Sequence, residues 1–178
     1  LLTGVFNRLA RSCFYGVAKK DGDEAAYRTG CIPAGAPSAE VLAETEQAIL
    51  AFEQAMYTFE FHHAQLVCDE LLRAANKRWS DASKAAKNQG DDDAMAQALI
   101  DAFHQLRAVT VLMHGIVPAG CDLICEHFAI DPKVFFSWDN IFMTCDELCA
   151  LLDEEPGSHR IKELPPRFDF FQKHESQY

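Results

Sequence analysis

Apolar side chains recur every three or four residues through most of this chain, and no other feature of the sequence constrains its fold more. In Leu2, Phe6, Leu9, Cys13 and Val17 the spacing follows the 3.6-residue period of a helix with one buried stripe. No segment alternates apolar and polar residues for long enough to predict a strand. The sequence therefore predicts an all-α fold, a bundle of about five helices followed by an irregular C-terminal extension.

The predicted helices are joined by short segments that contain turn-forming residues. The first runs from Leu2 to about Lys20, and a loop rich in glycine and proline follows it, in which Ser38 is a candidate N-terminal cap for the next helix. Pro118 fits the first turn of the fifth helix, and Asp131-Pro132 is expected to end that helix. The later helices are expected at 42–59, from 61 to the glycine signal at 88–90, from 93 to about 114, from 118 to the stop at 131–132, and as a short helix near 145–152.

The length and composition are typical of one ordered globular domain. The chain has 178 residues, of which 49% are hydrophobic and 24% are charged. No apolar run approaches the ~20 residues that span a bilayer, and no signal-peptide pattern is present. We therefore expect a cytoplasmic protein with no membrane partner. The first residue is not Met and the helical pattern begins at once, which favours a fragment of a longer protein.

The seven cysteines are expected to be reduced, because their number is odd and the chain is too large to need disulfides. Two pairs are spaced one helical turn apart with histidines nearby, from which a metal site can be imagined. The C-x-x-C knuckle of structural zinc sites is missing, so we interpret these cysteines as small buried apolar residues and predict no metal site. The residues concerned are Cys121 and Cys125, Cys145 and Cys149, His114 and His127.

Basic residues concentrate in two short segments of a chain whose net charge is −11. Residues 1–20 and 73–87 each carry a net charge of +4, so the remainder carries −19. Phosphate binding relies on Lys and Arg, so these segments could form a localised anion-binding face, with the acidic remainder restricting how RNA docks. The alternative interpretation is a pair of solvated helix faces, on which Lys and Arg are common.

An asparagine and an arginine, Asn7 and Arg11, stand four residues apart on the first predicted helix. They are followed in order by a Leu-Arg-Ala-Ala-Asn stretch ending at Asn76, a junction at 106–118, and an aromatic ending at 168–173. In order and spacing these stretches resemble the helical anticodon-binding domain that follows the catalytic domain in methionyl-tRNA synthetases. The resemblance extends over nearly the whole chain. Related class I synthetases with similar helical appendages remain an alternative.

The resemblance implies that residues 1–178 are the anticodon-binding domain of a longer synthetase, with the tRNA anticodon loop and the absent catalytic domain as partners. Asn7 and Arg11 would contact anticodon bases, since four residues apart they share one helix face about 6 Å apart in axial rise. Arg8, Arg78 and Lys84 would bind RNA from the two basic segments. Alternatively, Arg11 pairs with an acidic neighbour and Asn7 is a capping or solvated residue.

The sequence departs from the family at the site of one stacking residue. The family places a Pro-Trp pair nine residues after the asparagine that corresponds to Asn76, and here Lys84-Ala85 stands in its place. A stacking contribution of ~1–3 kcal/mol per base would be lost with that ring. Trp79 lies nearby, but it falls on the inward stripe of its helix and is predicted to be core. A helical interaction or scaffold domain that has lost its base contacts is therefore the alternative function.

The catalytic signatures of a class I synthetase are missing from the sequence. It contains neither a His-x-Gly-His turn nor a Lys-Met-Ser-Lys-Ser loop, and no glycine-rich phosphate loop or Ser/His/Asp arrangement stands out. We interpret His62-His63 and the Asp91–Asp93 run as ordinary solvated features. The fragment is therefore not expected to be an enzyme or to hold a cofactor, whereas its parent would use ATP and Mg to attach methionine to tRNA.

Overall fold

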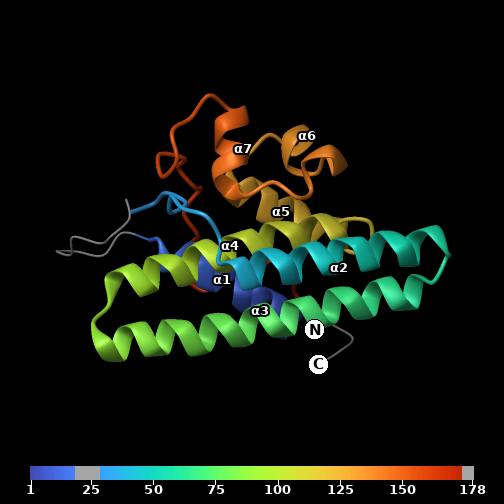
Figure 1. Cartoon of the computed structure of the whole chain (residues 1–178), viewed down its shortest axis with the longest axis horizontal. Helices are drawn as coiled ribbons and strands as arrows, with labels where there is room; N and C mark the ends of the chain where they lie inside the picture. Colours follow the sequence, from blue (N-terminus) through green and yellow to red (C-terminus); the bar gives the residue numbers. More distant parts are fainter. Residues whose placement is uncertain (19–28, 174–178) are drawn as a thin grey trace.

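The structure is a computed structural model that describes residues 1–18 and 29–173, and within these ranges it contains seven α-helices and no strand (Figure 1). The predicted all-α class is confirmed, and so is the irregular C-terminal part. The short helix expected near 145–152 is present at Cys145–Leu151, and the aromatic-rich stretch before it contains one further helix of a single turn, Pro132–Phe135. Across the same ranges, no helix combines the length and the apolar character needed to cross a bilayer.

Three long helices form the body of the molecule. Figure 1 shows α2 (Ala39–Tyr57), α3 (Phe61–Gln89) and α4 (Asp92–Met113) running alongside one another. α4 is the central helix, because every residue from Ala98 to Met113 is buried. We call α2, α3 and α4 the long-helix bundle.

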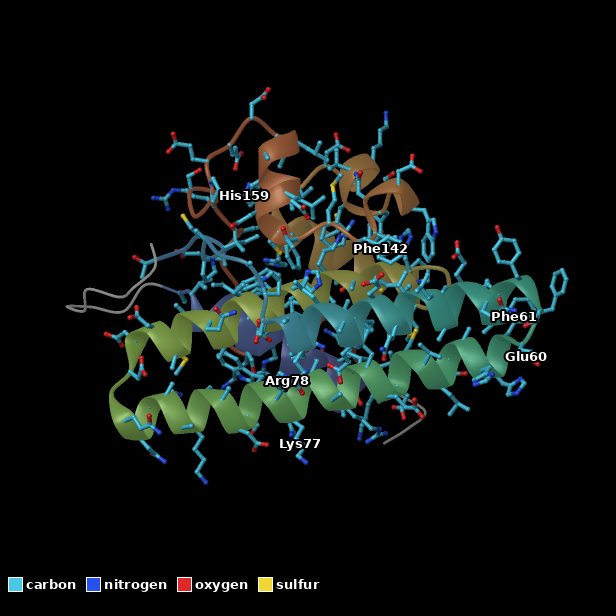
Figure 2. All side chains as sticks on the ribbon, in the orientation of Figure 1. Glu60, Phe61, Lys77, Arg78, Phe142 and His159 are labelled. Atoms are coloured by element: carbon cyan, nitrogen blue, oxygen red, sulfur yellow. The ribbon has the colours of Figure 1, made fainter. Side chains whose placement is uncertain are left out.

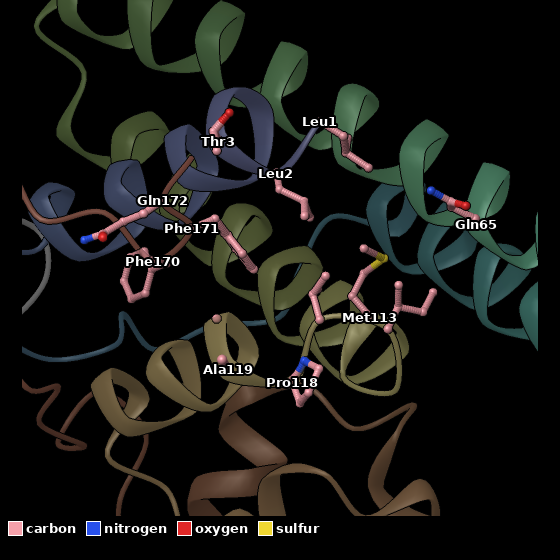
Figure 3. Close-up of a pocket in the computed structure, with 13 residues that line it drawn as sticks. Leu1, Leu2, Thr3, Gln65, Met113, Pro118, Ala119, Phe170, Phe171 and Gln172 are labelled. Carbon is pink, nitrogen blue, oxygen red and sulfur yellow. The ribbon is translucent and has the colours of Figure 1, made fainter. Parts of the chain in front are cut away.

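The remaining helices cover α4. α1 (Asn7–Gly16) follows a π-helical turn and packs against α3 and α4. α5 (Pro118–Phe128) lies on the other side of α4 from α3 in Figure 1. Beyond it come α6 (Pro132–Phe135), a 3₁₀ turn (Trp138–Asn140) and α7 (Cys145–Leu151). An irregular segment then returns to α1, and Figure 3 shows Phe171 and Gln172 beside Leu2 and Thr3 at the start of the chain. We call residues 129–173 the C-terminal cap.

One continuous apolar core joins the bundle to the cap. Phe14 of α1 makes edge-on contacts with Phe103 of α4 and Phe128 of α5, at ring-centroid distances of 5.8 and 5.4 Å. Phe128 in turn lies 5.0 Å from Phe135 of the cap. All seven cysteines are buried, as predicted, and none forms a disulfide. Burial raises the pKa of several of these thiols, that of Cys68 to about 12.

The first helix ends earlier than predicted, at Gly16 instead of about Lys20. The carbonyl of Val17 accepts a hydrogen bond from the N–H of Gly30 at 2.6 Å, so the chain leaves the helix to meet a distant segment. Gly16 also packs closely on α4, where a Cβ would lie 2.6 Å from Cδ2 of Leu99. Lys19 and Lys20 of the first basic segment lie outside the described residues.

Two capping expectations also need correction. Ser38 is the N-cap residue of α2, but its hydroxyl makes no cap bond and instead donates to Oδ2 of Asp101 on α4 at 3.0 Å. Asp131-Pro132 does not simply end the fifth helix. α5 ends at Phe128, its C-cap residue Ala129 lies in the left-handed region with φ of 56°, and Asp131 then caps α6. Both differences arise from contacts or turns that a local pattern does not specify.

Candidate nucleic-acid interface

A polar pocket of about 480 Å³ opens along α1. Its lining combines two guanidinium groups, three hydroxyls and an amide, with no carboxylate among the described lining residues. Such a donor-rich surface suits phosphate oxygens and the edges of bases, which offer acceptors to Arg, Ser and Tyr. The lining residues are Thr3, Gly4, Asn7, Arg8, Arg11, Ser12 and Tyr15.

Asn7 reaches this pocket but is only 3% exposed, because its amide binds the C-terminal cap. Its Oδ1 accepts hydrogen bonds from the N–H groups of Phe170 and Phe171 at 2.9 and 3.0 Å. Its Nδ2 donates to the carbonyl of Phe171 at 2.8 Å. In this conformation the amide is saturated by backbone groups and has little capacity left for a base.

Arg11 and Arg8 are the accessible cations of the pocket. The Arg11 side chain is 39% exposed, and its Nη1 forms an ion pair with Oδ1 of Asp169 at 3.3 Å. Its guanidinium carbon lies 5.9 Å from the ring centroid of Tyr15. Arg8 is exposed and forms no ion pair within the described part of the chain. A phosphate or a base edge can therefore reach both guanidinium groups, at Arg11 in competition with Asp169.

Tyr15 is a member of this site that the sequence reasoning missed. Its hydroxyl donates to the carbonyl of Pro165 at 2.6 Å and accepts from the N–H of Phe168 at 3.2 Å. Together with Asn7 and Arg11 it forms a stripe with a spacing of four residues, which holds the segment 165–171 against α1. The spacing alone could have drawn attention to Tyr15, since positions four apart share a helix face.

Arg78 is directed away from the α1 pocket. Its guanidinium binds carboxylates of α2, Glu44 at 2.6 Å and Glu40 at 3.3 Å, and it also donates to Gln105 of α4 at 3.3 Å. The hydrogen bond to Glu44 raises the pKa of Arg78. Figure 2 shows Arg78 on the α2 side of α3, with Lys77 pointing to the opposite side. The charge of Arg78 is thus compensated within the bundle.

Lys84 and its neighbour Ala85 are exposed on α3, and neither lines the α1 pocket. Trp79 packs against the core, as predicted, and its Cη2 lies 3.7 Å from an ideal Cβ position at Gly16. The C-terminal end of α1 therefore adjoins the middle of α3. The structure gathers Asn7, Arg8 and Arg11 in one pocket and leaves Arg78 and Lys84 outside it.

The cysteines and histidines that suggested a metal site are engaged elsewhere. His127 hydrogen-bonds the carbonyl of Lys162 through Nδ1 at 2.9 Å. His114 contacts Asp122 through Nε2 at 2.8 Å and stacks on Phe136, with ring centroids 3.8 Å apart. Among the described residues, no group of three or more His, Cys, Asp or Glu is arranged to hold a metal ion.

Compared with known proteins, the chain matches no protein-family model, and a search of curated proteins found no match.

Proposed function

We propose that this chain is an RNA-binding domain that contacts a tRNA anticodon loop through the α1 pocket, in the manner of the synthetase domain that its sequence resembles. The observation that carries the proposal is the pair of accessible guanidinium groups, Arg8 and Arg11, in a pocket with Ser12 and Tyr15. This pocket lies on the same helix where the resemblance places base contacts.

The chemistry of the pocket suits unstacked loop bases. Bases of a single-stranded loop can stack on an aromatic ring or on a guanidinium plane, and Arg11 and Tyr15 offer both at a separation of 5.9 Å. Arg8, which is exposed, is placed to bind a phosphate. Asn7 takes a positioning role in this proposal, because it fixes the cap segment that lies beside the pocket.

We further propose that the parent protein is a cytoplasmic, ATP- and Mg-dependent methionine–tRNA ligase. The fragment itself would be non-enzymatic, and it would support methionine attachment by holding the tRNA while the catalytic domain of the parent chain acts. The acidic remainder, with a net charge of −19 outside the two basic segments, would limit RNA to docking at α1.

A second candidate function is a helical scaffold domain without base reading. Two placements favour it: the amide of Asn7 is saturated by the cap, and Arg78 is paired with Glu44 and Glu40. The Lys84-Ala85 pair, which replaces the family's Pro-Trp, favours it as well. The two candidates differ in whether the α1 pocket discriminates between anticodons.

The test is binding of initiator methionine tRNA and of the same tRNA with a changed anticodon, measured over a range of salt concentrations. Arg11→Gln should weaken binding of the tRNA with the correct anticodon by ~1–3 kcal/mol and remove the preference for it over the changed anticodon. Arg8→Gln should weaken binding of both tRNAs equally and reduce the slope of log affinity against log salt concentration by about 1. Lys133→Gln on α6 removes the same charge away from the pocket and is the control. If the unmodified chain and every variant bound both RNAs equally and weakly, the result would favour the scaffold function.

A further inference from the structure

The end of the hairpin formed by α2 and α3 exposes large apolar side chains. Tyr57 is 77% exposed, Phe59 is 79% exposed and Phe61 is 58% exposed. The rings of Phe59 and Phe61 meet edge-on with centroids 6.3 Å apart, and Figure 2 shows Phe61 beside Glu60 at the far end of the hairpin. Exposed apolar side chains that cluster in this way often mark a surface where another molecule binds.

Phe59 occupies a backbone conformation that its side chain does not favour. Its φ is 59°, in the left-handed region where glycine is the usual residue at the end of a helix. A bulky residue there costs on the order of 1 kcal/mol, and a ring that is 79% exposed regains little of that from packing within the chain. A contact with a partner molecule would account for an aromatic residue at this turn.

A notch beside these rings adds a polar anchor. It has a volume of about 340 Å³ and lies between α2 and the 3₁₀ turn of the cap. The rings of Phe52 and Trp138 stand 6.3 Å apart, and Nε1 of Trp138 donates to Oε1 of Glu53 at 3.3 Å. Aromatic faces next to a carboxylate attract an organic cation. The notch is lined by Phe52, Glu53, Met56, Tyr57 and Trp138.

The charge of the surrounding helices selects for the same kind of ligand. Residues 46–61 contain three Glu residues and no Lys or Arg, a net charge of −3. This charge repels RNA phosphates, and it also repels a second copy of the same hairpin end. The complementary partner is positively charged and apolar.

We propose that this hairpin end, residues 52–61 together with Trp138, docks a basic amphipathic helical segment of a partner protein. The apolar side chains of that segment contact Tyr57, Phe59 and Phe61. A Lys or Arg side chain enters the notch, where its stem lies against Met56 and its charge faces Glu53 and the ring of Trp138. In this mode of recognition an amphipathic helix is bound through aromatic side chains of the hairpin end. The proposed docking site is separate from the α1 pocket and does not depend on RNA binding there.

The test uses a synthetic amphipathic peptide of about 18 residues, ~27 Å long as a helix, in which Leu recurs at helical spacing and Lys fills the other positions. Its affinity for the full chain is measured by calorimetry, alongside a peptide with Glu in place of Lys. The Lys peptide should bind, more weakly as salt increases, and the Glu peptide should show no binding. Equal binding of the two peptides would overturn the proposal, because apolar adhesion alone would then explain it.

Variants locate the contact. Phe59→Gly removes the ring and suits the positive φ, so the fold should be retained, and thermal unfolding checks this. We expect the double variant Phe59→Gly, Tyr57→Ser to bind the Lys peptide with an affinity that is lower by about tenfold or more. Glu53→Gln should lower the affinity for the Lys peptide by a smaller factor, and it should reduce the salt dependence of that binding.

The matched control is Leu151→Gln on α7, which removes an apolar side chain that is 52% exposed elsewhere. An equal loss of affinity in this control would overturn the proposal. Sedimentation of the free chain provides a second check. Self-association that Phe59→Gly abolishes would identify a second copy as the occupant and would also overturn it.

Discussion

The long-helix bundle and the C-terminal cap are stabilised in different ways. In the bundle, backbone groups form hydrogen bonds within each helix. Buried apolar residues such as Ile49, Cys68 and Leu99, one from each helix, pack the helices together. The cap has little regular structure of its own, so its backbone needs partners from outside the segment. Buried polar side chains of α1 and α4 supply them.

Arg107 of α4 is the clearest example. It is 1% exposed, and its guanidinium donates to the carbonyls of Phe135, Asn140 and Ile141 at 3.0, 2.6 and 3.0 Å. Burial lowers the pKa of Arg107 to about 10, and the group still carries its charge at neutral pH. The apolar period therefore determines where helices form, whereas a few buried polar side chains determine how an irregular segment is held against them.

The largest effect on stability is expected when the charge of Arg107 is removed from the interior. Arg107→Met should lower the free energy of unfolding by about 3–5 kcal/mol, because three buried carbonyls lose their donor. Chemical denaturation gives the loss, and hydrogen exchange should show that cap amides open before those of α3. Arg73→Met, which replaces an exposed arginine of α3 that pairs with Asp69, is the control and should lower the free energy of unfolding by less than ~1 kcal/mol. Uniform opening of the cap and the bundle would contradict the distinction between them.

Asn7 holds the other end of the cap, and its removal should have the next largest effect. Asn7→Ala leaves two N–H groups and one carbonyl of Phe170 and Phe171 without partners, which should cost about 2–3 kcal/mol. Limited proteolysis should then cut within 165–173 before any other described segment. Ser12→Ala, also on α1, is the matched control. If its cleavage pattern matched that of Asn7→Ala, the change would be due to α1 as a whole.

The same difference explains what the sequence could predict. The helices α3 and α4 begin and end within a residue or two of their predicted bounds, and α5 begins at Pro118 as predicted, because their apolar stripes, the glycine at 90 and Pro118 are local signals. The end of α1 at Gly16 was missed, since it depends on Leu99 and on the hydrogen bond from Gly30 to Val17.

The candidate site was predictable only in part. The Asn-x-x-x-Arg spacing identifies the helix that carries the pocket, and it places Asn7 and Arg11 on one face. It could not indicate that Asn7 is buried against Phe170 and Phe171, or that Arg78 pairs with Glu44. Each of these contacts joins residues far apart in the sequence, and a residue's partners at such separations are not encoded in local spacing.

On the bundle side, the burial of His104 predicts that the stability of the fold depends on pH. Burial, together with the charge of Arg107, lowers the pKa of His104 from 6.5 to about 4, and its Nδ1 has no hydrogen-bond partner within the described residues. The unfolded chain binds this proton at higher pH than the folded chain, so stability present above pH 6.5 is lost as the pH falls toward 4.

From pH 7 to pH 5 this difference corresponds to about 2 kcal/mol of unfolding free energy. His104→Gln should remove about that much of the pH dependence, as measured by denaturation at the two pH values. His62→Gln, which changes an exposed histidine, is the control and should retain the full dependence. If the pH dependence of His104→Gln were unchanged, His104 would not be the group responsible for it.

The smallest effect on stability is expected where the cap meets the α1 pocket. Asp169 and Arg11 form a half-exposed ion pair, so Asp169→Asn should change the free energy of unfolding by less than ~1 kcal/mol. The same change frees the guanidinium of Arg11 from a competing carboxylate, so affinity for the methionine tRNA should rise about two- to fivefold. Glu163→Gln removes an equal charge elsewhere in the cap and separates the specific contact from net charge. An equal gain in both variants would mean that RNA senses only the overall charge. A gain confined to Asp169→Asn would mean that a carboxylate of the cap occupies the position that a phosphate or base takes in the complex, so that one segment both completes the fold and limits binding.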